Sequence, residues 1–316
     1  MFEISVHICT HNPRPDYLRR TLEALRAQTL PVERWELLLV DNASTTETAR
    51  TAELSWHPNA RYIVESQLGK TNALLTALRS SHAAIMVTVD DDNLLAPDYL
   101  EKAIKIGERY PILGAWGGQL VPEFEEPPAE WTKAHWPTLA LRVFNEDRWS
   151  NLGEPSGCVP VGAGMCTRRE VALRYVENIE KSPIARQLDR RGKGLDGLGG
   201  MGDTQLALTS LEFGWGTGLF HELKAIHLTP KERMTEDYIA GRAEGGAFSR
   251  HLYNAFHGAP LEMPSVSPLR HLAASLKRRL TMNPRDRRFA EAKMRGYVRA
   301  VEFWQANAGT GEKVGK

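Results

Sequence analysis

The sequence predicts an α/β fold in which a mostly parallel central sheet is flanked by helices and followed by a C-terminal helical extension. Short apolar runs alternate with amphipathic stretches over residues 1–120, which is the order of strands joined by crossover helices. The runs 37–40 and 83–87 are apolar at consecutive positions, as strands are when both faces of a parallel sheet are covered.

The elements of the first half follow from these patterns. A helix over 16–28 places Leu18, Leu22 and Leu25 on one face, and Pro97 suits the first turn of a later helix. Strands are expected at 4–9, 35–40, 61–64, 85–89 and 112–119, and helices at 16–28, 46–54, 71–80 and 97–109.

The second half is less regular. Residues 121–156 are rich in proline and acidic side chains and contain Trp131, Trp136 and Trp149, which predicts a long connection or flap. These tryptophans either stack on the rings of a bound ligand or anchor the flap by packing. Further elements are expected as strands at 159–165 and 217–227, helices at 168–179 and 204–213, a mobile loop at 182–202 and two helices after 268.

The charge balance excludes some classes of protein. The chain has 316 residues with 40 Lys and Arg against 39 Asp and Glu, a net charge of +1, which gives no support to a nucleic-acid binder. Residues 267–300, however, carry ten basic and two acidic side chains. Such a segment either lies on an anionic membrane or forms a solvated helix face packed on the preceding α/β domain.

The location of the protein is predicted from its apolar runs and its cysteines. No run approaches the ~20 residues needed to cross a bilayer, and the N-terminal residues lack the pattern of a signal peptide. The three cysteines form no Cys-x-x-Cys pair, which favours reduced thiols. We therefore expect a cytoplasmic protein, with peripheral contact at the inner face of the membrane through residues 267–300 as an open alternative.

Polar residues follow the predicted strands where a ligand crevice is expected. Ligands of open α/β sheets bind beyond the carboxyl ends of the strands, and here those ends carry Thr10, Asp41, Lys70 and the run Asp90-Asp91-Asp92. Three adjacent carboxylates repel one another unless a cation compensates them, and Mg²⁺ or Mn²⁺ bridges carboxylates to phosphates. The pattern predicts a metal–diphosphate site, with a solvated turn or helix cap as the alternative.

Taken together, the motifs resemble those of the inverting, nucleotide-sugar-dependent glycosyltransferases of family 2, which have the Rossmann-like GT-A fold. The resemblance covers about residues 2–230 and implies a catalytic domain at 1–230. Its nucleotide-sugar-binding half would be 1–120 and its acceptor half 121–230, with the helical extension at 231–316. The stretches that carry it are VHICTHNPRPDYLRRTLEAL, LLLVDNAST, GKTNALLTAL and VTVDDDNLLAPDYL and, more weakly, VPVGAGMCTRREV and GDTQLALTSLEFGW.

The resemblance also implies roles for individual residues. Asp203 would be the general base that takes the proton of the acceptor hydroxyl, and Asp92 and His227 would hold Mn²⁺ or Mg²⁺ against the leaving diphosphate. A single displacement would invert the anomeric centre of the sugar. The residues that would bind the nucleotide sugar are Thr10, Asn12, Asp41, Lys70, Asp90 and Asp91.

One departure from the family pattern keeps alternatives open. The family usually has Glu-Asp at the base position, whereas this chain has Gly202-Asp203. Asp196 is a rival base, and Asp203 would otherwise be a helix N-cap. A G-x-G-x-x-G match at 197–202 lacks the preceding strand that a dinucleotide site needs.

The expected function is therefore glycosyl transfer from a nucleotide-diphosphate sugar to a glycan or lipid-linked acceptor, in glycan, polysaccharide or glycolipid biosynthesis. The alternatives are a nucleotidyltransferase and a non-catalytic relative that binds a sugar or nucleotide.

Overall fold

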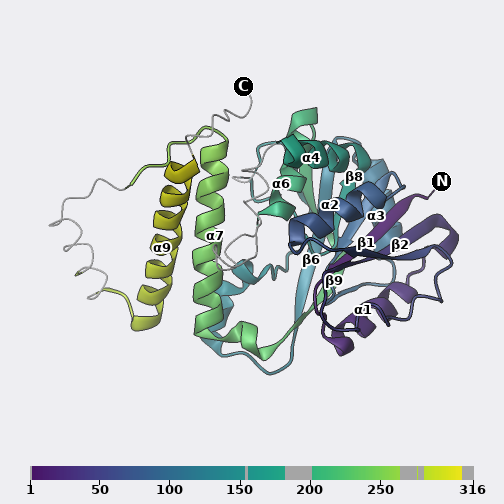
Figure 1. Ribbon diagram of the computed structural model, residues 1–316, viewed down its shortest axis with the longest axis horizontal. Coiled ribbons are helices and arrows are strands. Elements are labelled where there is room, and N and C mark those ends of the chain that lie inside the picture. Colours follow the sequence, from purple (N-terminus) through teal and green to yellow (C-terminus); the bar gives the residue numbers. More distant parts are fainter. Residues whose placement is uncertain (1, 154–155, 182–200, 264–275, 277–280, 308–316) are drawn as a thin grey trace. The chain divides into compact units, whose positions relative to one another are not determined.

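The computed structural model describes residues 2–153, 156–181, 201–263, 276 and 281–307, which fall into two compact units (Figure 1). The larger unit comprises residues 1–127, 140–181 and 202–230, and the smaller unit includes 128–139 and 231–316.

The larger unit is built on one mixed sheet. Among the described residues its strand order is β3-β2-β1-β4-β8-β6-β9-β5, with β7 paired to β9. β3, β2, β1 and β4 are mutually parallel, β8 is antiparallel to β4 and β6, and β9 is parallel to β6. The strands are β1 (Ile4–Thr10), β2 (Trp35–Asn42), β3 (Ala60–Glu65), β4 (Ile85–Val89), β5 (Asn93–Leu95), β6 (Leu113–Phe124), β7 (Arg148–Ser150), β8 (Met165–Arg168) and β9 (Gly216–Thr229).

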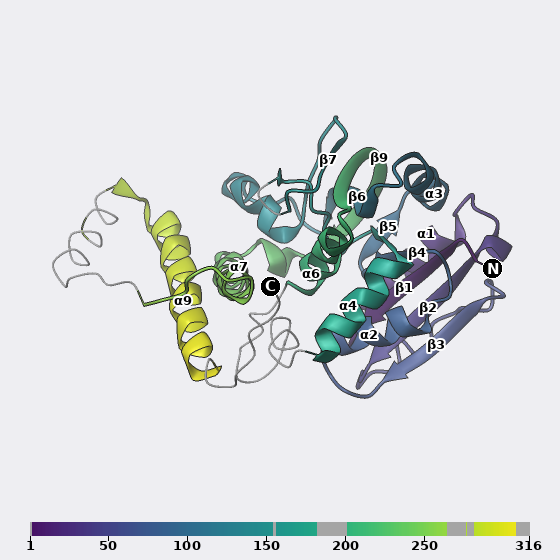
Figure 2. The same cartoon turned by 90° about the horizontal axis from the view of Figure 1, so that it is seen from above.

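Helices cover both faces of this sheet, as Figures 1 and 2 show. They are α1 (Pro15–Arg26), α2 (Lys70–Ser80), α3 (Tyr99–Arg109), α4 (Arg169–Lys181) and α6 (Gly202–Leu208). The larger unit also contains the 3-10 turns η1 (Val32–Arg34) and η4 (Thr209–Phe213), and the smaller unit contains η2 (Glu130–Leu139) and η5 (Lys231–Met234). The α/β class and nearly all the expected strands and helices of residues 1–120 are confirmed, with shifts at their ends.

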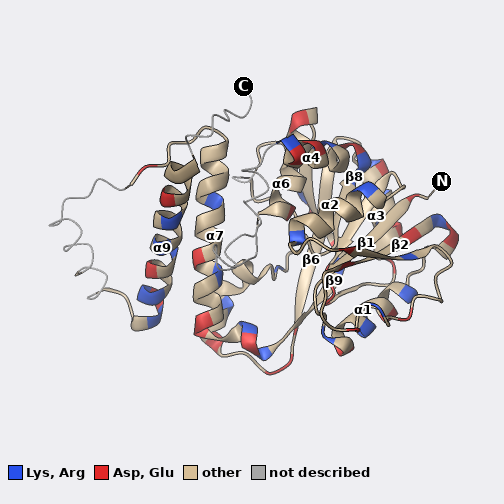
Figure 3. Ribbon diagram, in the orientation of Figure 1, with Lys and Arg blue, Asp and Glu red and all other residues tan. Residues whose placement is uncertain are grey.

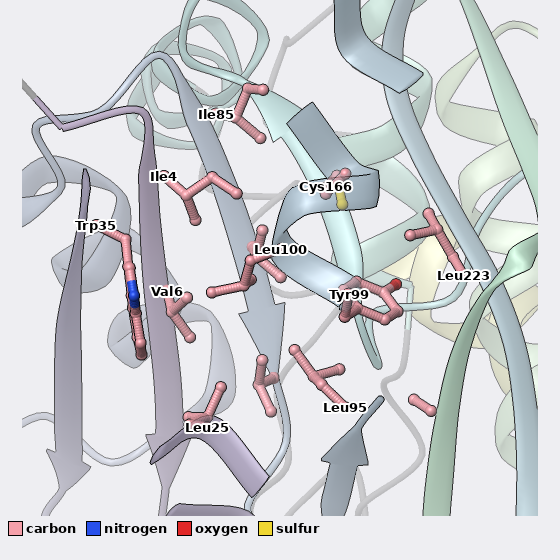
Figure 4. Close-up of a cluster of buried hydrophobic side chains, with 14 of the residues drawn as sticks. Ile4, Val6, Leu25, Trp35, Ile85, Leu95, Tyr99, Leu100, Cys166 and Leu223 are labelled. Carbon is pink, nitrogen blue, oxygen red and sulfur yellow. The ribbon is translucent and has the colours of Figure 1, made fainter. Parts of the chain in front are cut away.

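Alternating side chains of the strands fill two cores. Leu37 and Leu39 pack in the main cluster with Leu22 of α1 and Leu100 of α3. Figure 4 shows part of this cluster, including Leu25 of α1 and Leu100 of α3. Leu38, between them, packs with Ala73 of α2 on the other face. This two-sided burial is why β2 is apolar at consecutive positions. β1 and β2 end together, with Thr10 opposite Asp41.

The prediction of a helix at 46–54 is wrong. Residues 43–56 form turns, with a single helix-like bond from the Thr51 N–H to the Glu47 carbonyl at 2.8 Å. Threonines lower helix propensity, and only Ala49 of 46–54 is buried. Instead, the side-chain carbonyl of Asn12 accepts the backbone N–H groups of Thr45 and Thr46 at 2.8 and 3.2 Å.

Two further boundaries differ from the expectation. The strand expected at 159–165 begins only at Met165, because Gly162 and Gly164 make a turn in which Gly164 has φ = 76°. The helix expected from Pro97 begins at Tyr99, after a turn closed by the Tyr99 N–H on the Ala96 carbonyl at 2.9 Å.

The segment expected as a flap contains ordered structure. β6 runs on to Phe124, η2 follows it, and β7 pairs with β9. Trp149 packs on Tyr110 with ring centroids 5.1 Å apart, and Trp131 stacks on Phe289 at 6.0 Å. These contacts favour the packing interpretation for both tryptophans.

The smaller unit contains two long helices, α7 (Glu236–Phe256) and α9 (Pro284–Asn307). Phe248 of α7 packs with Ala300 and Val301 of α9 in a small core. The first C-terminal helix that the sequence predicts, after 268, lies largely outside the described residues. Across the described part of the chain, no helix combines the length and the apolar character needed to cross a membrane.

Ion pairs account for most of the described basic residues of α9, and Figure 3 marks the charges along both helices. Glu244 of α7 pairs with Arg295 and Arg299 at 2.9 and 3.3 Å, and Arg285 pairs with Glu236 at 2.7 Å. These pairs join α9 to α7 within the smaller unit, and packing of the basic segment on the catalytic domain stays a prediction. Membrane contact stays a prediction for the rest of the basic segment, where Arg270 and residues 277–279 lie outside the described residues.

Candidate active site

The acidic run follows β4, as expected, and forms a tight turn between β4 and β5. The Asp90 N–H donates to the Asn93 side-chain carbonyl and the Asn93 N–H donates to the Asp90 carbonyl, both at 3.1 Å. Thr10, at the end of β1, donates its hydroxyl to Asp91 Oδ2. The structure therefore brings Thr10 and Asp91 together from positions 81 residues apart.

Asp92 and His227 face each other because β5 pairs with β9. The pairing places Asn93 opposite His227, and the Leu228 N–H donates to the Asp92 carbonyl at 2.9 Å. His227 Nδ1 lies 3.7 Å from Asp92 Oδ1, and both residues are buried. Asn93 Nδ2 lies 3.0 Å from the same oxygen and 2.8 Å from His227 Nδ1.

This pair is a partial ligand set for a cation. Within the described ranges, no three His, Cys, Asp or Glu side chains are grouped as a preformed metal site. A carboxylate and an imidazole within 3.7 Å of each other nevertheless fit a Mg²⁺- or Mn²⁺-type ion, which takes one or two protein ligands and completes its shell with phosphate and water.

Asp41 lies at the end of β2, beside Thr10 in the sheet register. It is buried, and the Tyr62 hydroxyl donates to its Oδ2 at 2.5 Å while the Ser44 N–H donates to Oδ1 at 3.1 Å. Burial and this carboxylate raise the pKa of Tyr62 to about 12. Because a carboxylate has about four acceptor positions, Asp41 retains capacity for a further donor.

Asn12 has a different placement from the other predicted nucleotide-binding residues. Its backbone is left-handed, with φ = 49°, and its side-chain carbonyl accepts N–H groups from the turns after β2. Asparagine tolerates this conformation better than most residues. The amide of Asn12 therefore fixes the loop after β2, in which the Ser44 N–H donates to Asp41.

Lys70 and Asp203 form the centre of the site. Lys70 begins α2, whose start is fixed by the Gly69 N–H donating to Asn42 Oδ1 at 2.7 Å. Its Nζ donates to Asp203 Oδ2 at 3.0 Å and lies 3.7 Å from Asp90 Oδ1. The two carboxylates belong to α6 and the turn after β4, so the ammonium group joins two elements distant in sequence.

The carboxylate of Asp203 is seated against a glycine. A Cβ built on Gly162 would lie 2.2 Å from Asp203 Oδ2 and 2.3 Å from its Cγ, so no larger residue fits there without moving the carboxylate. Oδ1 of Asp203 is buried and has no hydrogen-bond partner among the described residues. Gly162 was missed as a site residue, although the two glycines of 159–165 were a signal of close backbone approach.

This geometry bears on the alternatives for Asp203. The residue is the second of α6. Among the described residues, its carboxylate accepts a hydrogen bond from Lys70 Nζ and none from a backbone N–H of the helix. The N-cap interpretation is therefore not supported. The rival base Asp196, and residues 197–200 of the glycine-rich match, lie outside the described residues.

Two titratable side chains of β1, His7 and Cys9, lie on the face of the sheet that α2 covers. His7 is buried with Nε2 2.9 Å from Thr88 Oγ1, and burial lowers its pKa to about 4. Burial raises the pKa of the Cys9 thiol to about 12, so this cysteine is not a thiolate nucleophile at neutral pH.

Comparisons with known proteins agree with the resemblance. The family model described as glycosyl transferase family 2 matches residues 5–173. The chain is 29% identical over 126 residues to the amylovoran biosynthesis glycosyltransferase AmsE of Erwinia amylovora, which covers 39% of this chain and 46% of that protein. It is 30% identical over 112 residues to the uncharacterized protein y4gI of Sinorhizobium fredii, covering 34% of this chain and 12% of that protein. The chain thus spans less than half the length of these curated relatives.

Solved structures share the fold. The mannosyltransferase PcManGT of Pyrobaculum calidifontis, in complex with GDP-Man and Mn²⁺, superposes with a TM-score of 0.56 at 19% identity, covering 98% of this chain and 88% of that one. TarS residues 1–349 of S. aureus, in complex with UDP-GlcNAc, has a TM-score of 0.50 at 12% identity, covering 99% and 93%. Because the family model spans more than half of the residues, from β1 into α4, the chain belongs to glycosyltransferase family 2.

Proposed function

We propose that the chain transfers a sugar from a nucleotide-diphosphate donor to an acceptor hydroxyl, with inversion at the anomeric carbon. The observation that carries this proposal is the environment of the Asp203 carboxylate. Its Oδ2 is held by Lys70 while its buried Oδ1 has no partner among the described residues. An unpartnered buried carboxylate oxygen is costly unless a ligand donates to it, and an acceptor hydroxyl is such a donor.

The donor would bind at the same edge of the sheet. Asp41, with Thr10 beside it in register, has acceptor capacity for the N–H groups of a nucleobase. Asp91 accepts from Thr10, and Asp90 lies 3.7 Å from Lys70 Nζ. PcManGT and TarS were solved with GDP-Man and UDP-GlcNAc, which supports a nucleotide-sugar donor for this family member.

Asp92 and His227 would hold a divalent cation against the diphosphate. When bound, such an ion neutralises the charge that develops on the leaving diphosphate. The 3.7 Å separation of the two side chains and the Mn²⁺ of the PcManGT structure support this assignment, with Mn²⁺ or Mg²⁺ as the ion.

The side chains of this protein would take the proton of the acceptor hydroxyl and orient the acceptor for attack. Asp203 Oδ1 accepts the proton of the acceptor hydroxyl as its oxygen attacks the anomeric carbon. The attack comes from the face opposite the leaving group, so one displacement inverts that carbon. A glycan or lipid-linked acceptor, and a place in polysaccharide or glycolipid biosynthesis, agree with the amylovoran-related relative.

The experiment is a panel of UDP-, GDP-, CDP- and dTDP-sugars incubated with the chain and Mn²⁺, with release of the nucleoside diphosphate as the readout. We expect release from at least one donor, and release that is slower by about 10²–10⁴-fold after Asp203→Asn. Binding of a donor with no release by the wild type, with or without added acceptors, would favour a non-catalytic relative. Release of pyrophosphate from a nucleoside triphosphate would favour a nucleotidyltransferase.

A further inference from the structure

Two arginines of the segment after η2 lack a carboxylate partner in the described part of the chain. Arg142 exchanges backbone hydrogen bonds of 2.9 and 3.1 Å with Leu120 of β6. Its half-buried guanidinium donates from Nη1 to the Val159 carbonyl at 3.0 Å. Arg148, at the start of β7, is exposed and lies over the Phe144 ring, 5.3 Å from its centroid.

The electrostatic surroundings leave both guanidinium groups available to an anion. Burial lowers the pKa of Arg142, and repulsion from Arg148 lowers it further. Asp147, the sequence neighbour of Arg148, is engaged elsewhere, because its Oδ1 accepts the His221 N–H at 2.9 Å and lies 2.7 Å from His221 Nδ1. A partly desolvated cation next to a second cation is unfavourable until an anion offsets it.

The position of Arg142 connects this pair of charges to the proposed base. Val159, which accepts from Arg142, precedes Gly162 by three residues, and Gly162 lies against the Asp203 carboxylate. The side chains assigned to the donor are instead those of Lys70 and the Asp90–Asp92 turn, on α2 and after β4. Arg142 therefore contacts the segment that carries Gly162, and Arg148 lies over the ring of Phe144, two residues along the chain from Arg142.

We propose that Arg142 and Arg148 form a subsite for an anionic group, a carboxylate or a phosphate, carried by the acceptor. The planar donor fork of arginine matches both oxyanions and binds them through charge-assisted hydrogen bonds. The inference rests on the proposed function, because the acceptor is defined by Asp203. It adds the chemical class of the acceptor, a charged sugar or a phosphorylated glycan.

The test measures binding of charged monosaccharides to the full chain. Thermal unfolding is followed with glucuronate, glucose 6-phosphate or glucose at matched ionic strength, because a ligand of the native state raises its stability. We expect at least one charged sugar to raise the midpoint and glucose to leave it unchanged. Stabilisation by glucuronate alone indicates a carboxylate-bearing acceptor, and stabilisation by glucose 6-phosphate alone a phosphate-bearing one.

Variants assign the effect to the two arginines. Arg142→Gln and Arg148→Gln should each weaken the apparent affinity for the charged sugar about tenfold, as expected for loss of a charge-assisted hydrogen bond. Arg109→Gln, which removes an exposed arginine of α3 stacked over Tyr110, is the matched control and should bind as the wild type does. If Arg142→Gln fails to fold, the exposed Arg148 still gives a decisive variant.

Two results would overturn the subsite. One is equal stabilisation by glucose and by the charged sugars, and the other is unchanged affinity for charged sugars in the Arg148→Gln chain. Binding of nucleoside diphosphates in the same assay tests the proposed function separately. Nucleotide binding without binding of charged sugars leaves the proposed function standing and removes the subsite.

Discussion

Lys70 Nζ lies 3.0 Å from Asp203 Oδ2, and the same nitrogen lies 3.7 Å from Asp90 Oδ1. One ammonium group thus stands between the proposed general base and the acidic turn assigned to the donor. The three side chains are between a fifth and a third exposed, at 23%, 23% and 32%, so water and ligands reach them. The Lys70 ammonium group therefore contacts both the residue proposed to act on the acceptor and the turn proposed to bind the donor.

Replacing that cation should weaken donor binding. In Lys70→Met, two carboxylates lose their shared counter-charge and repel the incoming diphosphate. We expect the Kd of UDP or GDP, measured by calorimetry, to rise at least about tenfold, the scale of one lost charged hydrogen bond. Lys102→Met removes a lysine that pairs with Asp98 at 2.7 Å on α3 and is the control. Equal Kd values for the two variants would contradict the role of Lys70.

A methyl group at Gly162 should move the base without removing it. The added Cβ of Gly162→Ala would lie 2.2 Å from Asp203 Oδ2, so the carboxylate must shift. Because a general base acts through position, we expect turnover to fall by about 10²-fold. Gly241→Ala, where a Cβ meets nothing within 4 Å, is the control for the same change. Full activity of Gly162→Ala would show that turnover does not depend on the position of the Asp203 carboxylate.

The pair Asp92–His227 should determine the response to metal. Asp92→Asn removes the charged ligand group, and we expect nucleotide binding to lose most of its dependence on Mn²⁺. Titration of nucleotide affinity against Mn²⁺, with and without a chelator, checks this. Asp98→Asn changes an exposed carboxylate that directly precedes α3 and pairs with Lys102, and it should retain the metal dependence. A wild-type chain whose nucleotide affinity ignores both Mn²⁺ and chelator would contradict the assignment.

Buried histidine should make the fold sensitive to mild acid. The pKa of His7 is lowered from 6.5 to about 4 by burial, so the unfolded chain binds a proton first as the pH falls. Stability from this residue is complete above pH 6.5 and is lost toward pH 4, by at most about 1.4 kcal/mol per pH unit. Denaturant unfolding at several pH values should show a shallower pH slope for His7→Gln. An identical slope would contradict the prediction, although His57, with the same shift, adds its own contribution in both proteins.

The contact between α7 and α9 depends on a glycine. A Cβ on Gly296 would lie 2.2 Å from the Glu244 carbonyl oxygen, so Gly296→Ala should separate the helices. We expect a loss of about 1–3 kcal/mol in the unfolding free energy of the smaller unit, as for overpacked cores. Gly246→Ala, which meets nothing within 4 Å on α7, should be neutral or stabilising by up to about 1 kcal/mol. A stabilised Gly296→Ala would show that the helices are not in close contact there.

The sequence predicted the larger part of this fold because the sheet is doubly covered. Burial on both faces makes β2 and β4 apolar at consecutive positions, a signal that needs no tertiary information. The helix expected at 46–54 does not form, and a distant residue is involved. Asn12, more than 30 residues away, accepts the N–H groups of Thr45 and Thr46. Local propensity does not contain that contact.

The same distinction applies to the site. The strand-end positions of Thr10, Asp41 and Asp90–Asp92 follow from topology, and the sequence placed them at one edge. The pairing of Lys70 with Asp203 spans 133 residues, and the place of Gly162 behind the carboxylate depends on how the 158–164 turn packs. Neither of these two contacts leaves a periodic pattern in the sequence, so only the three-dimensional structure reveals them.

The most direct test of the central claim is the rate of nucleoside diphosphate release from the donor panel by the wild type, Asp203→Asn and Asp98→Asn. The account predicts that the wild type and Asp98→Asn release the nucleotide from the same donor at similar rates, while Asp203→Asn is slower by about 10²–10⁴-fold. Release by Asp203→Asn at the wild-type rate would contradict the assignment of Asp203 as the base.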